Sequence, residues 1–232
     1  MATLNTGHAL YGNIISCAPF YATPSTAQRI DIAPGGTTIS LTKWVGHANG
    51  VEGPEATGTE TAANIDTSAL SSGHNKISIG LVFDVVTTPG FGSTGDNFLV
   101  TCGDLSLRYF NNGLRGRKAS DLTSSYTVGN GSTEVVAVVT FDSDQSTFGT
   151  ARLYVGGTLR QSISSFPTGT KPTTVTSAFS ASDGSVIKRL EVVWNKQLSD
   201  AEVTSWSADP YAIVASGGGG SSSRRLSIFW MD

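Results

Sequence analysis

The sequence predicts an all-β domain: an antiparallel two-sheet sandwich with one short helix near the C-terminal end. Only 14% of the 232 residues are charged, whereas the chain holds 27 glycines and 8 prolines. This composition is typical of short strands joined by many turns, and it argues against a helical bundle or a coiled coil. Several segments also alternate apolar with small or polar residues, as strands with one buried face do. A sandwich of this length commonly forms a single domain.

The first clear strand covers residues 77–85, where every odd position is apolar and predicts one buried face. A second alternation runs from Leu105 to Tyr109 and reaches Asn112-Gly113. That dipeptide favours a hairpin, because a type I′ turn needs positive φ at both central residues. The sequence therefore predicts paired antiparallel strands in the middle of the chain.

Later strands carry equally direct signals. Residues 135–141 (VVAVVTF) are nearly all apolar, as expected for a strand at the centre of a sandwich. Gly156-Gly157 lies between residues 152–155 and 158–161 and predicts a second hairpin. The last core strand is predicted to turn one set of side chains inward: Leu190, Val192 and Trp194.

One short helix is predicted directly after that strand. Ser199-Asp200-Ala201-Glu202 is a capping box, in which the serine hydroxyl and the glutamate carboxylate satisfy each other's backbone N–H groups. Val203 and Trp206 are expected to face the sheet. Asp209-Pro210 ends the helix, because proline disfavours a helical residue before it.

Residues 1–40 are predicted to form an extended N-terminal arm. They contain one basic and one acidic residue, and three prolines interrupt any helix. Their apolar side chains need burial, which a solvated disordered tail would not provide. We expect the arm to lie on a neighbouring subunit or particle, with few contacts to its own sandwich, through these attachment residues: Tyr11, Ile14, Ile15 and Phe20.

The C-terminal residues 215–232 form the other predicted arm. ASGGGGSSS has linker composition, and the RRLSIFWMD that follows can form a terminal strand. Its candidate attachment residues are Leu226, Ile228 and Trp230. The predicted organisation is therefore an arm over 1–40, a sandwich over 41–214, and a linker with a tail strand over 215–232.

The order of pieces between residues 77 and 206 resembles the laminin-G/concanavalin A-like lectin sandwich, in the form common in bacteriophage virion proteins. ISIGLVFDVV resembles the opening core strand of that family, and EVVAVVTFDSD with ARLYVGGTLRQS resembles its apolar strand, acidic turn and hairpin. IKRLEVVWNKQLSDAEVTSW resembles the closing strand and helix. ADPYAIV resembles the segment after the helix, where the family usually has tryptophan in place of Tyr211. The resemblance implies a concanavalin A-like jelly roll, which hosts lectins, glycosidases and structural modules alike.

The sequence offers no set of catalytic residues. Glycosidases of this fold pair carboxylates on one strand, but Glu191 stands alone and is expected to point to solvent. Calcium is the one metal to consider, with Asp142 and Asp144 as candidate ligands in a turn. Acidic residues two apart more often form the turn itself, so no cofactor is predicted.

Several partners are excluded by charge and hydropathy. The net charge is −3, so no basic field attracts nucleic acid. No apolar run is long enough for a membrane span, and the N-terminus lacks the basic and apolar regions of a signal peptide. Cys17 and Cys102 are either small buried side chains or a disulfide pair, and the sequence leaves both open.

The sequence thus favours a non-enzymatic virion structural protein of a tailed bacteriophage, a capsid or tail decoration protein or short fibre on the virion surface. Its expected partners are other virion proteins and further copies of itself, bound through the arms. The alternative is a module that binds carbohydrate or a host receptor, for which Trp44 is the candidate glycan contact. A glycan hydrolase is the third class.

Overall fold

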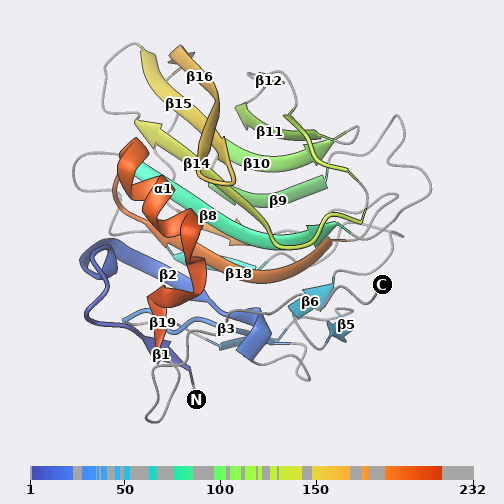
Figure 1. Cartoon of the computed structure of the whole chain (residues 1–232), viewed down its shortest axis with the longest axis vertical. Helices are drawn as coiled ribbons and strands as arrows, with labels where there is room; N and C mark the ends of the chain where they lie inside the picture. The colour runs from blue at the N-terminus through green and yellow to red at the C-terminus, as the bar shows by residue number, and fades with distance from the viewer. Residues whose placement is uncertain are drawn as a thin grey trace, which may run out of the picture.

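The protein, seen in a computed structural model, is a sandwich of two antiparallel sheets with a third layer on one side (Figure 1). The structure describes residues 2–22, 28–34, 36, 38–40, 45–47, 50–52, 63–66, 76–85, 97–102, 105–110, 113–118, 120–121, 126–129, 131–142, 148–167, 174–177 and 186–215. Within them, the predicted all-β jelly-roll sandwich with one short α-helix is confirmed.

The larger sheet has eight strands. In spatial order they are β16 (Thr158–Pro167), β15 (Phe148–Val155), β14 (Val135–Asp142), β8 (Lys76–Val85), β18 (Val186–Trp194), β6 (Gly50–Glu52) and β5 (Val45–His47), with β2 (Ile14–Ala18) also paired to β18.

The smaller sheet has seven strands. They are β12 (Ser120–Asp121), β11 (Gly113–Lys118), β10 (Leu105–Phe110), β9 (Asn97–Cys102), β17 (Thr174–Ser177) and β7 (Ala63–Asp66), with β13 (Tyr126–Thr127) paired to β11. Two further pairs lie apart from both sheets: β1 (Thr3–Leu4) with β19 (Val214–Ala215), and β3 (Gln28–Ile30) with β4 (Thr38–Ser40).

The inner core lies between the two sheets. The odd residues of β8, from Ile77 to Val85, are all buried there, which confirms the predicted period of two. The smaller sheet contributes Leu99, Leu107 and Leu114 to the same cluster. These contacts hold the sheets face to face.

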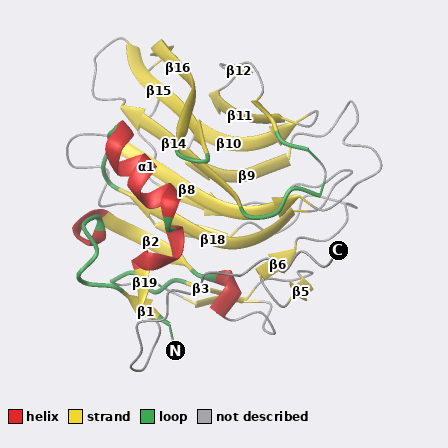
Figure 2. Ribbon diagram, viewed as in Figure 1, coloured by secondary structure: helices red, strands yellow, loops and turns green. Residues whose placement is uncertain are grey.

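The other face of the larger sheet is covered as well. Helix α1 (Asp200–Ala208) packs on β14 and lies over β8 in Figure 2. The 3-10 helices η1 (Tyr11–Asn13), η2 (Phe20–Ala22) and η4 (Pro210–Ile213) add to the same layer. Val203 and Trp206 of α1 are buried against the sheet, as predicted. Leu190, Val192 and Trp194 belong to this outer cluster, and the Trp194 and Trp206 rings meet edge to face at 5.3 Å. The central strands of the larger sheet, β8 and β18, are therefore buried on both faces.

The structure corrects the prediction of a free N-terminal arm. Residues 14–18 form β2, which pairs with β18 inside the larger sheet. Ile14 and Phe20 are buried in the chain's own core, and Tyr11 and Ile15 pack against it. Pairing completes the edge of β18 and covers apolar surface that would otherwise face water. Ile14 and Phe20 are thus not available to attach the chain elsewhere.

The domain boundaries change accordingly. β1 pairs with β19, so the first and last described strands lie side by side at the bottom of Figure 1. The sandwich includes the residues assigned to the arm and does not begin at residue 41. Leu226, Ile228 and Trp230 lie outside the described residues, as do Trp44 and Asp144.

Both predicted hairpins are present. Gly156 and Gly157 have φ of 58° and 74° and connect β15 to β16, as a type I′ turn requires. In the other hairpin Phe110 pairs with Gly113. Gly113 is therefore the first residue of β11 and not the central turn residue that the sequence predicts.

Candidate functional site

A cluster of aromatic and charged side chains lies on the outer side of the larger sheet. We call it the tyrosine–arginine site and define it by five residues: Tyr21, Asp84, Glu134, Arg189 and Tyr211. Asp84 comes from the end of β8, Arg189 from β18 and Glu134 from the residue before β14. The tyrosines come from η2 and η4, so the site joins segments from both ends of the chain.

Arg189 and Asp84 form the buried base of the site. The Nε group of Arg189 donates to both Asp84 carboxylate oxygens at 2.9 Å, and Nη2 donates to Oδ2 at 2.7 Å. The two side chains are only 14% and 12% exposed. Charge-assisted pairs of this geometry fix the guanidinium plane.

A β-bulge presents Arg189 to this pair. Lys188 is opposite Phe83 and Leu190 is opposite Val82, which leaves Arg189 as an extra residue in the ladder. Bulges of this kind re-aim a side chain and occur often beside functional sites. The bulge also places Lys188 and Leu190 on opposite faces of the sheet.

Glu134 forms the exposed rim of the site. Its backbone N–H donates to Asp84 Oδ1 at 2.7 Å, and its Oε1 accepts from Arg189 Nη1 at 3.0 Å. The side chain remains 46% exposed. Its φ of 51° lies in the left-handed region, where glycine is the least strained residue. Two backbone irregularities, the bulge and this residue, therefore meet at one place.

Tyr21 and Tyr211 complete the site with a pair of partly exposed rings. Their centroids are 5.0 Å apart and the rings are 80° from parallel, an edge-to-face pair. The Tyr211 hydroxyl donates to Glu134 Oε1 at 3.4 Å. Burial, with the Glu134 carboxylate adding to it, raises the pKa of Tyr211 to about 12; burial also raises that of Tyr21. Both hydroxyls therefore stay protonated near neutral pH and can donate hydrogen bonds.

The sequence analysis missed this site. Tyr211 lay in the segment after the helix and Asp84 in the first strand, but neither was considered as a site residue. The bulge could not be read from IKRLEVV, since its alternation breaks without a glycine or proline to mark it. The one available signal was the pair Lys188-Arg189 in a largely apolar strand.

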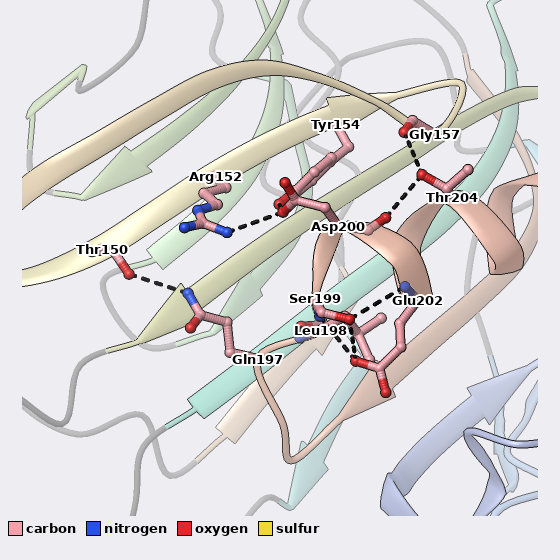
Figure 3. A network of polar contacts seen from close by, with 11 residues as sticks. Thr150, Arg152, Tyr154, Gly157, Gln197, Leu198, Ser199, Asp200, Glu202 and Thr204 are labelled. Carbon is pink, nitrogen blue, oxygen red and sulfur yellow. Dashed lines mark hydrogen bonds and ion pairs between the residues drawn. The ribbon is translucent and has the colours of Figure 1, made fainter.

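A second polar cluster surrounds the start of α1 (Figure 3). Asp200 accepts from Arg152 Nη1 at 3.0 Å and from the Tyr154 hydroxyl at 2.7 Å. Gln197 donates to Thr150 at 3.1 Å, and the Ser199–Glu202 capping box is present as predicted. These groups satisfy one another and hold the helix on β15, so we assign this cluster a structural role.

A buried ion pair corrects the expectation that Glu191 points to solvent. Glu191 and Lys188 are both fully buried, with Lys188 Nζ 3.2 Å from the Glu191 carboxylate. Lys188 also donates to the Leu99 carbonyl in β9 of the facing sheet. The larger sheet has no solvent face here, so both side chains of the pair lie in the interior.

The remaining sequence candidates are placed as follows. Asp142 lies 3.4 Å from Lys76 in an ion pair. Within the described ranges no three His, Cys, Asp or Glu side chains group as metal ligands, and no helix is long and apolar enough to cross a membrane. Cys17 lies in the outer cluster, on the face of its sheet turned away from the sheet that contains Cys102. That orientation does not favour a bridge between them.

Comparison with known proteins supports the fold. The sequence matches no protein-family model, and no curated protein matches it. Solved structures match well in shape. Botulinum neurotoxin type C, whose cell entry depends on two ganglioside molecules, has a TM-score of 0.67 and 10% identity over 86% of this chain and 51% of its own.

Two other solved structures give the same picture. The binding domain of botulinum neurotoxin DC, in complex with rat synaptotagmin II, has a TM-score of 0.64 and 11% identity over 86% of this chain and 52% of its own. Trypanosoma rangeli sialidase has a TM-score of 0.61 and 14% identity over 87% of this chain and 33% of its own. The chain thus spans between a third and about half of the length of these proteins. At such low identity the likeness shows the fold alone, a lectin-like, concanavalin A-like jelly roll.

Proposed function

We propose that the chain is a non-enzymatic module that binds a carbohydrate or a receptor on a cell surface. The tyrosine–arginine site is the observation that carries this proposal. Two partly exposed rings offer apolar surface, and the charged groups beside them offer hydrogen bonds that orient a ligand. Ligand sites commonly combine these two features.

The structural neighbours support the same class of function. Botulinum neurotoxin type C depends on gangliosides for cell entry, and the neurotoxin DC domain binds synaptotagmin II. One partner is a glycan and the other a protein receptor. We propose only the same class of ligand for this chain, because 10–11% sequence identity does not support the choice of a particular molecule.

The described carboxylates favour binding over hydrolysis. Glycan hydrolysis needs two carboxyl groups beside the scissile bond, one of which exchanges a proton. Asp84 is held by Arg189 and by the Glu134 amide, and Glu191 is buried beside Lys188. Among the described residues, Glu134 is therefore the one exposed carboxylate of the site, and the second exposed carboxyl group that hydrolysis requires is not beside it. We therefore propose that the likeness to a sialidase reflects shared fold and not shared chemistry.

We further propose that the module stands on the surface of a tailed-bacteriophage virion, as a decoration protein or short fibre. The sequence resemblance of residues 77–206 to phage virion sandwiches supports this setting. Attachment would fall to the predicted tail residues Leu226, Ile228 and Trp230. Self-association was predicted from the N-terminal arm and loses that basis, because the arm is buried in its own fold.

Replacing Tyr211 tests the proposed function. The full chain with Tyr211→Ala should no longer bind bacterial cells or a glycan array, because one of the two rings that would contact the ligand is removed. Tyr126→Ala is the matched control: Tyr126 is a partly buried tyrosine that packs against the inner core and not on the outer side of the larger sheet, with the Arg160 guanidinium 4.4 Å from its ring centre. Unchanged binding by Tyr211→Ala, with a folded protein, would refute the assignment.

A further inference from the structure

We infer that the tyrosine–arginine site takes an uncharged, hydroxyl-rich saccharide and rejects acidic sugars, with Glu134 as the residue that determines this specificity. The inference rests on the proposed function and narrows its ligand class. It rests on the hydrogen bonds that the charged groups of the site already make with one another.

The positive charge of the site is not available to an anionic ligand. The Nε–Nη2 edge of Arg189, which would hold a carboxylate in two parallel hydrogen bonds, is occupied by Asp84 at 2.7–2.9 Å. Nη1 is taken by Glu134 at 3.0 Å. The Arg189 side chain as a whole is also only 14% exposed. An acidic sugar would have to displace one of these carboxylates.

The group that the site does present is an acceptor. Arg189 and Tyr211 both contact Oε1 of Glu134, which leaves Oε2 without a hydrogen bond to any described residue. Sugar hydroxyls donate well to a carboxylate, whereas a second carboxylate there would meet like charge. With one guanidinium and two carboxylates, the site is net negative. Both features select a neutral ligand.

The backbone conformation at Glu134 indicates a role for its side chain. At φ of 51° glycine would remove the strain, and an exposed ion pair adds little to stability. Strain that persists in this way points to a functional residue. The neighbouring tyrosines supply the apolar surface on which the C–H face of a sugar ring can lie.

The test compares neutral and acidic polysaccharides. Immobilised dextran, mannan and galactan are set beside polygalacturonate, hyaluronan and polysialic acid, and the full chain is applied to each. We expect binding to at least one neutral chain and at least tenfold weaker binding to every acidic one. Glu134→Gln keeps the shape of the side chain but removes its charge. It should therefore reduce the ratio of neutral to acidic polysaccharide binding several-fold.

Glu134→Gly separates specificity from structure. It should lose most neutral binding while its melting temperature stays level or rises, because the strained residue is relieved. Asp200→Asn is the matched control, since Asp200 is another exposed carboxylate paired with an arginine on the same side of the sheet. It should leave binding unchanged.

The outcomes separate the two proposals. Preference for an acidic polysaccharide that Tyr211→Ala abolishes would overturn the inference and leave the binding function standing. A Glu134→Gln variant with an unchanged neutral-to-acidic ratio would also overturn it. Failure of the wild-type chain to bind any glycan or any bacterial cell would overturn both.

Discussion

At the residue scale, side-chain volume decides the packing of the outer cluster. Gly80 lies in the middle of β8, beneath the Trp194 and Trp206 rings. Glycine normally weakens a strand, because it has no side chain to pack and loses much conformational freedom. Here the missing Cβ makes room for two indoles that are 0% and 1% exposed. The space above one small residue thus sets how closely α1 approaches the sheet.

Gly80→Ala should destabilise the protein by about 1–3 kcal/mol. An added Cβ would lie 2.6 Å from the Trp206 ring and 2.9 Å from the Trp194 ring, so one ring must move. Urea unfolding followed by tryptophan fluorescence measures the loss. Gly129→Ala is the control, because its nearest neighbour would be 3.8 Å away. Equal stability of both variants would contradict the packing described here.

At the element scale, α1 is defined by its first turn. Ser199 Oγ accepts from the Glu202 N–H at 3.3 Å, and the Glu202 carboxylate accepts from the Ser199 N–H at 2.9 Å. Lys196 adds a further hydrogen bond to Glu202. Burial raises the pKa of Glu202, but the hydrogen bonds from Lys196 and Ser199 outweigh it and hold the pKa below the usual 4.5.

Removing either half of the capping box should cost stability. We expect about 1 kcal/mol for Ser199→Ala at pH 7, since a helix N-terminal N–H loses its acceptor. Glu202→Gln should also destabilise at pH 7. Because the folded pKa of Glu202 is lowered, its contribution is present above pH 4.5 and disappears as the pH falls through the folded value. Thermal melts of wild type and Glu202→Gln should therefore converge in acid; a constant difference would rule this out.

At the scale of the whole molecule, the two ends of the chain build the third layer together. Asn5 N–H donates to the Ile213 carbonyl at 2.9 Å, and Asn5 Nδ2 donates to the Ala212 carbonyl at 2.9 Å. β2 then extends the sheet beside β18. The N-terminal segment is thus a component of the core, and the tyrosine–arginine site depends on it for Tyr21.

Deleting residues 1–22 should therefore prevent cooperative folding. The deletion removes the buried side chains of Leu4, Leu10, Ile14 and Phe20. At about 1.5–3 kcal/mol for each, the loss is roughly 6–12 kcal/mol, comparable to the whole stability of a domain. Circular dichroism and heat-capacity measurements would show it. A truncated chain with a sharp unfolding transition would restore the idea of a detachable arm.

Deleting residues 216–232 should have the opposite result. The Gly/Ser stretch after Ala215 has linker composition and separates the tail from the core strands in sequence, so the truncated chain should melt near the wild-type temperature. If Leu226, Ile228 and Trp230 attach the chain to a virion, incorporation into particles should fall. Normal incorporation would remove the attachment role from the tail.

The sequence by itself determined the features that depend on neighbours along the chain. The alternation in β8, the Gly156-Gly157 turn and the Ser199 cap were predicted because strand period, positive φ and capping are local properties. Together with the resemblance of residues 77–206 to a known sandwich, they predicted the two-sheet fold.

Only the tertiary structure decided which faces are covered and where the site lies. Whether Glu191 or Ile14 meets solvent depends on segments more than a hundred residues away, because burial is a property of the assembled layers. The same holds for the bulge at Arg189 and the left-handed φ of Glu134, which the surrounding contacts impose on residues that do not favour them. The tyrosine–arginine site exists because both ends of the chain fold onto one face of the larger sheet.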